Sequence, residues 1–365
     1  MTTIVLSAGG TAGHLFPAQA LAAELSRRGR NIVVMTDSRG KNYGAAFPGA
    51  TIETVPSGSP SEGSTLARLL FPFAVLRGIV VAFAKILRIK PSAVIGFGGY
   101  PSLPVIVAAL LGGYPTAIHE QNAVPGRVNR LVASHVKAIA ASFPFARFAP
   151  ANAKAVTLTG NPVRPEAAAL STAVYQPIGT TGPIRILVFG GSQGARALSE
   201  VVPAAIARLP TASKSRLEIA QQCRPEDLEF VRLAYATGGV NADLASFFND
   251  LPARIADAHL VISRGGASTV SELAAIGRPA ILIPYPFATD DHQTANASVL
   301  ANANAGWSIQ QNELSPEKLA TMLEQILSNP DELVRRAKAA HALGKPDAAE
   351  RLADLVERIG LKEAA

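Results

Sequence analysis

This sequence has little cysteine and little charge. One cysteine, Cys223, stands among its 365 residues, which excludes an internal disulfide framework and a zinc site built from cysteines. Charged residues make up 17% of the chain and hydrophobic residues 48%, a composition that excludes a disordered protein and predicts a globular one. The sequence also lacks an Asp-x-Asp pair that could hold a divalent cation, and we expect neither a metal nor another cofactor.

No uninterrupted apolar stretch of the sequence suits a membrane crossing. Residues 91–118 carry no Asp, Glu, Lys or Arg, but glycines and prolines divide them into strand, glycine loop, helix and strand, which predicts a buried βαβ unit. The apolar residues of 66–90 are interrupted by five basic ones: Arg68, Arg77, Lys85, Arg88 and Lys90. That pattern suits helices lying on an anionic membrane surface, and the alternative is a buried helix pair with solvated basic edges.

Charge is unevenly distributed along the chain. Residues 1–163 hold 15 Lys and Arg against 5 Asp and Glu, an excess of +10, whereas the remainder holds 19 against 22, or −3. A basic first half suits an anionic small molecule, an anionic membrane or a nucleic acid. Basic runs interleaved with aromatics are absent, so we do not expect nucleic acid as a partner. Met1 leads directly into an apolar strand, which favours a cytoplasmic protein without a secretory leader.

Strands alternate with helical patterns along the whole chain, which predicts an α/β protein with parallel sheets. The length exceeds one ordinary core and suits two domains. Two prolines flank Arg164, so we expect an N-terminal domain over 1–163 and a C-terminal domain over 164–344. A final helix within 345–365 would cross back to the first domain. We also expect residues 167–183 to form a connecting loop, and a short strand near 245–247.

Three glycine-rich turns, in residues 9–14, 190–196 and 264–269, each stand between an apolar strand and a helix. Glycines let backbone amides approach an anion, and the helix N-terminus adds unpaired N–H groups, so each turn could bind a phosphate. Alternatively, each is a tight turn without a ligand. A dinucleotide site in the first turn is disfavoured because Ala8 stands where that motif has its first glycine. Glu272, inside the third helix, could accept both ribose hydroxyls of a nucleotide or be a plain salt-bridging residue.

Seven motifs occur in order over nearly the whole chain: G-G-T-x-G-H, G-F-G-G-Y-P-S, H-E-Q-N, G-N-P-V-R, G-G-S-Q-G-A, S-R-G-G-A-S-T-V-S-E and D-H-Q-x-x-N-A. In this combination the sequence closely resembles the MurG family, bacterial N-acetylglucosaminyltransferases that convert lipid I to lipid II. The resemblance implies the GT-B fold, in which two Rossmann-like, doubly wound parallel-sheet domains face a cleft.

The resemblance also implies substrates and partners. The donor would be UDP-N-acetylglucosamine, and the acceptor lipid I, undecaprenyl-pyrophosphoryl-MurNAc-pentapeptide, at the cytoplasmic face of the inner membrane. That anionic membrane surface would be a partner, as would cell-wall and division proteins.

Site residues carry over from the family by position. Among the donor contacts, the backbone at Phe248 would hold uracil and Glu272 the ribose, while Arg164 would approach the donor. The diphosphate would lie among Ser192, Ala267, Ser268 and Thr269. The remaining substrate contacts would be Thr11, Ala12, Gly13, Asn122 and Gln293, together with His14. Two departures from the family pattern stand out: Ala12 replaces a glycine, and Gln-Gln-Cys-Arg at 221–224 replaces H-Q-T-G or H-Q-S-G.

The chemistry that this resemblance implies requires a base. A sugar hydroxyl must lose a proton as it attacks the anomeric carbon, and the departing UDP must have its charge stabilised. Histidine side chains can titrate near neutrality, and His14 stands at the end of a strand, so it is the first candidate for the base, with Glu120 and His119 next. Alternatively, His14 only forms hydrogen bonds at the helix start. Amides of the second-half glycine turns and Arg164 would stabilise UDP.

Three other functions remain open: a non-hydrolysing UDP-N-acetylglucosamine 2-epimerase, a nicotinamide oxidoreductase and a non-catalytic UDP-sugar-binding protein at the membrane.

Overall fold

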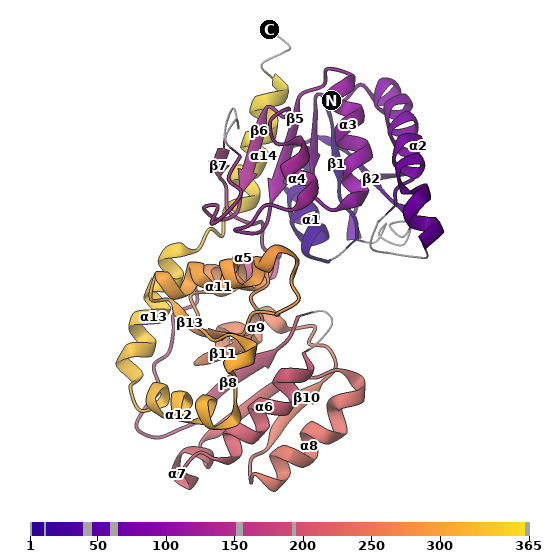
Figure 1. Cartoon of the computed structure of the whole chain (residues 1–365). Coiled ribbons are helices and arrows are strands. Elements are labelled where there is room, and N and C mark those ends of the chain that lie inside the picture. Colours follow the sequence, from indigo (N-terminus) through magenta and orange to yellow (C-terminus); the bar gives the residue numbers. More distant parts are fainter. Residues whose placement is uncertain are drawn as a thin grey trace. The chain divides into compact units, whose positions relative to one another are not determined.

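The computed structural model describes residues 2–10, 12–38, 46–58, 65–150, 156–191 and 195–361, without the side chains of Ala12, 65–70 and Leu361. The chain divides into two compact units (Figure 1): unit 1 is Met1–Arg164 with Asp347–Ala365, and unit 2 is Pro165–Pro346. Each unit contains one sheet in which all strand pairs of the described residues are parallel. The predicted α/β class with two Rossmann-like sheets is therefore confirmed.

The sheet of unit 1 has the strand order β3-β2-β1-β4-β5-β6-β7. Its strands are β1 (Thr3–Ser7), β2 (Asn31–Thr36), β3 (Thr51–Thr54), β4 (Ala93–Gly96), β5 (Thr116–Glu120), β6 (Ala138–Ala141) and β7 (Val156–Leu158). The order reverses direction between β1 and β4, and in doubly wound sheets ligands bind beyond the carboxyl ends of the strands at such a point.

Alternate residues of β1 supply two separate cores, one on each face of the unit 1 sheet. Ile4 and Leu6 pack with α1 (Ala12–Arg27) and α14 (Ala348–Leu361) on one face. Val5 belongs to the opposite face, which is covered by α2 (Thr65–Ile89), α3 (Leu103–Leu111) and α4 (Arg127–Val132). The period-2 alternation of a strand thus places one β1 residue after another on opposite faces of the sheet.

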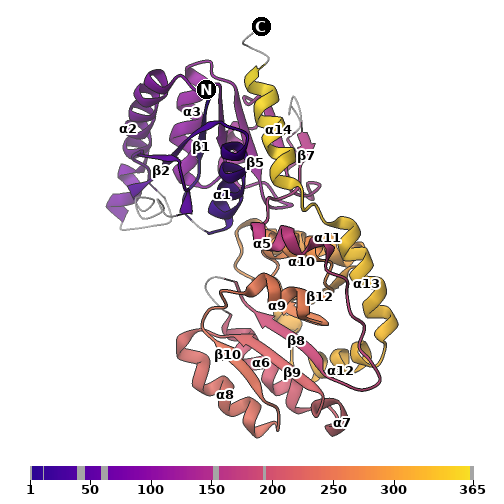
Figure 2. The same ribbon diagram turned by 180° about the vertical axis from the view of Figure 1, so that it is seen from behind.

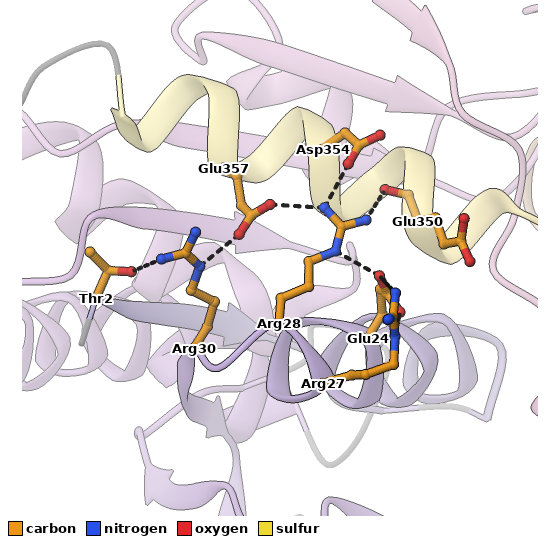
Figure 3. A network of polar contacts seen from close by, with 8 residues as sticks. All are labelled: Thr2, Glu24, Arg27, Arg28, Arg30, Glu350, Asp354 and Glu357. Atoms are coloured by element: carbon orange, nitrogen blue, oxygen red, sulfur yellow. Dashed lines mark hydrogen bonds and ion pairs between the residues drawn. The ribbon is translucent and has the colours of Figure 1, made fainter.

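The helix α14 comes from the far end of the chain and lies beside α1 (Figure 2). Ion pairs fasten it there (Figure 3): Arg28 Nη1 lies 2.6 Å from Asp354 Oδ1 and 2.8 Å from Glu357 Oε2. Arg30 Nε adds a bond of 2.6 Å to Glu357 Oε1, and Arg28 Nε lies 2.6 Å from Glu24 Oε1. This arginine–carboxylate network adds to the buried apolar face of α14 (Leu352, Ala353, Leu355 and Val356) in holding the helix in unit 1.

The sheet of unit 2 has the order β10-β9-β8-β11-β12-β13. Its strands are β8 (Ile184–Phe189), β9 (Leu217–Gln222), β10 (Ala242–Ala245), β11 (Leu260–Ser263), β12 (Ala280–Leu282) and β13 (Gly306–Ser308). The helices of this unit are α5 (Pro165–Ala169), α6 (Arg196–Ala207), α7 (Thr211–Lys214), α8 (Leu228–Thr237), α9 (Leu251–Asp257), α10 (Ala267–Ile276), α11 (His292–Asn302), α12 (Pro316–Leu327) and α13 (Pro330–Leu343). The switch point here lies between β8 and β11, the strands that precede two of the glycine turns.

Three local predictions need correction. The segment expected as a loop over 167–183 begins with α5 and a 3₁₀ turn at Leu170–Thr172, because Pro165 has the fixed φ that suits a first helical position. The strand expected near 245–247 ends at Ala245, where its pairing with β9 stops. Residues 66–89 lie in one helix, α2, whereas both interpretations of this segment expected more than one helix.

The βαβ unit expected in residues 91–118 is present as β4, α3 and β5. Within the described ranges of the chain, no helix is long and apolar enough to cross a membrane.

Candidate functional site

The first glycine turn places the start of α1 at the carboxyl edge of the unit 1 sheet. Gly10 has a φ of +90°, a conformation that side chains disfavour. A Cβ built on Gly9 would lie 2.9 Å from Pro101 Cβ and 3.1 Å from Thr36 Oγ1, so the turn packs closely against both neighbours. Thr11 lies outside the described residues, as does the side chain of Ala12, whereas Gly13 is exposed in the first turn of α1.

His14, also in the first turn of α1, is half-buried and lies against the loop that follows β4. A Cβ on Gly98 would lie 3.4 Å from His14 Cε1, and one on Gly99 would lie 3.3 Å from His14 Cδ2. Both glycines have positive φ, so the loop needs glycine for its backbone as well as for the space. His14 Nδ1 lies 3.2 Å from Oε1 of Gln121, which follows β5 directly. The imidazole therefore has a defined place at the switch point.

Glu120, the last residue of β5, is almost completely buried and accepts four hydrogen bonds. Its Oε1 accepts from the backbone N of Asn122 at 2.9 Å and from Asn122 Nδ2 at 3.3 Å. Its Oε2 accepts from the backbone N of Gly126 at 2.8 Å and from Asn129 Nδ2 at 2.7 Å. The carboxylate thus organises the loop between β5 and α4, and it also fixes the side chain of Asn122.

His119 lies beneath this loop and is fully buried. Burial lowers the pKa of its imidazole to about 4, outweighing a hydrogen bond to the Gly160 carbonyl that acts in the opposite direction. His119 is therefore neutral near pH 7. The structure brings His14, His119, Glu120 and Asn122 together at one edge of the unit 1 sheet.

Several buried polar atoms at this edge lack a hydrogen-bond partner in the described part of the chain. They are Ser7 Oγ at the end of β1, Thr36 Oγ1 at the end of β2, and Asn129 Oδ1 on α4. Buried polar groups are normally paired, so these atoms leave capacity for water or for polar groups of a ligand. Arg164, at the end of unit 1, lies on the ring of Phe16 with its Cζ 5.8 Å from the ring centre.

The glycine turn before α10 is the best-defined candidate anion site among the described residues of unit 2. Gly266 is the N-cap of α10, and no side chain caps this helix end. Because the first amides of a helix have no partner within it, the N–H groups of Ala267, Ser268 and Thr269 are positioned to bind an anion. Gly265 allows the close approach of α11, since a Cβ there would lie 2.4 Å from the carbonyl oxygen of Gln293.

The other predicted donor contacts of unit 2 surround the same edge. Glu272 is inside α10 and only 4% exposed. Gln293 Oε1 accepts a hydrogen bond of 2.9 Å from the backbone N of Tyr285, which fixes that side chain at the start of α11. Phe248 is buried after β10, under the guanidinium of Arg254 at 4.1 Å. In the second glycine turn, Gly191 has a φ of +82° before α6, whereas Ser192 lies outside the described residues.

Two residues of these edges escaped the sequence analysis. Gln121 was not predicted as a site residue, although it stands in H-E-Q-N directly after a buried strand, where functional side chains of a parallel sheet are expected. Arg264 directly follows β11, and its Nη1 donates to the carbonyls of Ile283 at 3.1 Å and Pro284 at 3.3 Å. It is 8% exposed, and burial lowers the pKa of its guanidinium. Arg264 thus brings a positive charge to the glycine turn before α10.

The departure at residues 221–224 faces the interior of unit 2. Gln221 is fully buried, and its Oε1 accepts a bond of 2.5 Å from the hydroxyl of Tyr235 on α8. Cys223 is also fully buried, and desolvation raises the pKa of its thiol to about 11. Arg224 is held by Asp227 through bonds of 2.8 and 2.7 Å. These residues join β9 to α8 and do not offer a reactive group.

Comparison with known proteins gives the class first. The N-terminal domain of glycosyltransferase family 28 matches residues 4–141, and the C-terminal domain of that family matches residues 185–352. The crystal structure of MurG from Acinetobacter baumannii is 31% identical with a TM-score of 0.80, covering 98% of this chain and all of the other.

A protein of Paramagnetospirillum magneticum is 52% identical over 97% of this chain and 95% of its own length. Its name is UDP-N-acetylglucosamine--N-acetylmuramyl-(pentapeptide) pyrophosphoryl-undecaprenol N-acetylglucosamine transferase. The chain belongs to the MurG family of glycosyltransferases. A UDP-GlcNAc 2-epimerase from Neisseria meningitidis, bound to UDP-GlcNAc, is 12% identical with a TM-score of 0.67 over 99% of this chain and all of the other, a likeness of fold alone.

Proposed function

We propose that this protein is an inverting glycosyltransferase that moves N-acetylglucosamine from UDP-N-acetylglucosamine to lipid I, giving lipid II for peptidoglycan. The observation that carries the proposal is the full-length likeness to transferases of that name, 52% identical for the relative from P. magneticum. The 2-epimerase alternative is less supported, because that likeness extends only to the fold.

Proton transfer belongs to His14. As the acceptor hydroxyl attacks the anomeric carbon, the bond from that carbon to the UDP oxygen breaks, and the hydroxyl proton passes to the imidazole. Glu120 is the weaker candidate for the base, because its two oxygens already accept four hydrogen bonds within the loop. Glu120 instead holds Asn122, which would contact the sugar from that loop.

Unit 2 would bind the donor and stabilise the leaving UDP. The amides of Ala267, Ser268 and Thr269 would hold the diphosphate. Further hydrogen bonds to it would come from Arg164 and from the second glycine turn, which includes Ser192. Glu272 would accept the ribose hydroxyls, the Phe248 backbone would meet the uracil, and Gln293 would reach the sugar. In unit 1, Thr11, Ala12 and Gly13 would complete the substrate contacts. No step in this scheme calls for a metal.

The proposal extends to the anionic membrane surface at the cytoplasmic face of the inner membrane, where the lipid acceptor resides; cell-wall and division proteins would be further partners. Four exposed apolar residues on α2 support it: Phe73, Leu76, Val80 and Leu87. Their helical spacing puts them along one face, and Arg77 and Lys90 are exposed near them. Phe71 does not belong to this surface, since its ring packs edge-on against that of Tyr100, with the two ring centres 5.6 Å apart.

The test is incubation with labelled UDP-N-acetylglucosamine, with and without a lipid I analogue. We expect the label to move to the lipid only when the analogue is present. Conversion of the donor to its 2-epimer without an acceptor would support the epimerase instead. Donor binding without turnover under either condition would support a binding protein.

A further inference from the structure

The amide of Gln121 lies between two histidines, and the backbone fixes which way it points. Its Nε2 lies 3.0 Å from the carbonyl oxygen of Phe97 and 3.3 Å from that of His119. Carbonyl oxygens only accept hydrogen bonds, so the amide nitrogen must occupy this position. Oε1 consequently lies on the other side of the amide, toward His14.

His119 agrees with this orientation. Its Nε2 lies 3.2 Å from the Gly160 carbonyl oxygen, which can only accept, so Nε2 carries the hydrogen of the neutral ring. Its Nδ1 therefore has the lone pair, and it accepts from Gln121 Nε2 at 3.0 Å. The hydrogen bonds run in one direction, from Gln121 through His119 to Gly160, and reversing the amide would break both ends of this chain.

The consequence falls on His14. Gln121 Oε1, which only accepts, lies 3.2 Å from His14 Nδ1, so Nδ1 must carry a hydrogen. In a neutral imidazole the lone pair is then on Nε2. The ring is also confined by the backbone of Gly98 and Gly99. Both the tautomer and the position of His14 are thus set from Gln121 and the glycine loop.

We propose that Gln121 is a positioning residue for glycosyl transfer, whose amide oxygen selects the His14 tautomer with Nε2 as the proton acceptor. The inference rests on the proposed function, because that function makes His14 the base. The acceptor hydroxyl gives its proton to Nε2 while its oxygen bonds to the anomeric carbon, and the bond from that carbon to the UDP oxygen breaks as UDP leaves. The resulting imidazolium keeps its Nδ1–H bond to Gln121. Isolated neutral histidine side chains favour the tautomer with the hydrogen on Nε2, so the hydrogen bond from Nδ1–H to the Gln121 oxygen must outweigh that intrinsic preference.

The test compares Gln121→Met, which keeps the length but removes the acceptor, with Gln19→Met on α1 as the control. We expect kcat to fall roughly 10- to 100-fold in Gln121→Met, less than most of the ~10²–10⁴ that a general base supplies because His14 itself remains, with the KM for the donor within a few-fold. Nitrogen NMR of ¹⁵N-histidine protein should show His14 protonated at Nδ1 in the wild type and in Gln19→Met, and shifted toward Nε2–H in Gln121→Met.

Wild-type His14 protonated at Nε2 would overturn the inference, and so would a Gln121→Met enzyme with unchanged kcat. If Gln121→Met does not fold, the tautomer of His14 in the wild type still decides. The proposed function can fail separately. If no sugar is transferred to lipid I, or if His14→Asn is fully active, His14 is not the base of a lipid I transferase. The tautomer of wild-type His14 measured by NMR would be unaffected by either outcome.

Discussion

The carboxyl ends of the strands differ between the two units, although both sheets have the same doubly wound order around a switch point. In unit 1 the edge carries side chains that bond to one another: His14 to Gln121, and Glu120 to its loop. In unit 2 the corresponding edge leads into glycine turns and an uncapped helix start at Gly266. Both edges contain a glycine turn, but hydrogen-bonded side chains dominate the unit 1 edge, whereas the amides at the start of α10 dominate the unit 2 edge.

This difference matches two chemical demands. Proton transfer needs a titratable group held in one orientation, which a buried side-chain network provides. Binding a diphosphate needs several donors and little side-chain bulk, which a glycine turn and a helix N-terminus provide. Changes in unit 1 should therefore alter turnover, and changes in unit 2 should alter donor affinity.

The largest expected effect is that of His14→Asn. Turnover should fall roughly 10²–10⁴-fold, because a general base contributes that much, while donor affinity stays within a few-fold. Single-turnover kinetics and calorimetric titration of UDP-N-acetylglucosamine measure the two quantities. A parallel fall in both would make His14 a binding residue and erase the contrast between the units.

Glu272→Ala should act in the opposite way. Losing a carboxylate that accepts two hydroxyls costs about 1.5–3 kcal/mol, so UDP should bind roughly ten- to a hundredfold more weakly. UDP lacking its ribose hydroxyls should bind the wild type and the variant alike. Equal losses for UDP and this analogue would refute the ribose assignment. In a double variant with His14→Asn, the losses in turnover and affinity should combine, because one residue is expected to act on proton transfer and the other on donor binding.

The sequence predicted much of the fold because its strands are buried, apolar runs separated by glycine and proline. The βαβ unit of 91–118 and the helical position of Glu272 were both readable in this way. The strand β10 was misplaced because it is a poorly buried edge strand, whose residues lack the apolar signal of a core strand. Pairing with β9, which fixes its register, is a long-range contact that local pattern does not encode.

The candidate site was predictable only as a set of positions. Strand ends identified where His14, Glu120 and Glu272 stand, but the direction of each hydrogen bond depends on backbone carbonyls distant in sequence, such as Phe97 and Gly160. For the same reason Gln121 was missed, since its role exists only between two histidines. The departure at Gln221 and Cys223 was visible in the sequence, yet its burial against α8 was not.

The exposed apolar residues of the two units allow a third, smaller test. Replacing Phe73 and Leu76 on α2 with Ser should weaken binding to anionic liposomes by about 2 kcal/mol, given the apolar area that each side chain exposes. The matched control replaces Phe230 and Leu233 on α8, which are similarly exposed but accompanied by the paired charges Glu229 and Arg232. This control should leave liposome binding unchanged.

Charge reversal at Arg77 and Lys90 should also release the protein from anionic liposomes, because each basic group near the surface contributes about 1 kcal/mol. Lys85 and Arg88 are unsuitable for this test, because both pair with Glu53. Activity on a short-chain soluble acceptor should survive all of these changes. If the wild-type protein does not bind anionic liposomes at low salt, the proposal that α2 contacts the membrane is wrong.

The smallest effect should come from the network that holds α14 to unit 1. Burial raises the pKa of Glu357, but hydrogen bonds from Arg28 and Arg30 prevail and hold it below its usual value of 4.5. The pKa of Glu24 is also lowered, chiefly by its hydrogen bond from Arg27. A lowered folded-state pKa stabilises the protein above the unfolded pKa, and the contribution disappears as pH falls through the folded one.

Glu357→Gln should therefore destabilise α14 by about 1–1.5 kcal/mol between pH 7 and 5, with the difference from wild type shrinking below about pH 4.5. The single tryptophan, Trp307, lies in unit 2, so hydrogen exchange of α14 peptides is the suitable measurement. Glu218→Gln, which breaks the exposed pair with Arg185 in unit 2, should cost only about 0–0.5 kcal/mol. A loss for Glu357→Gln that persists unchanged to pH 3 would show that packing, and not the charged carboxylate, holds this helix in unit 1.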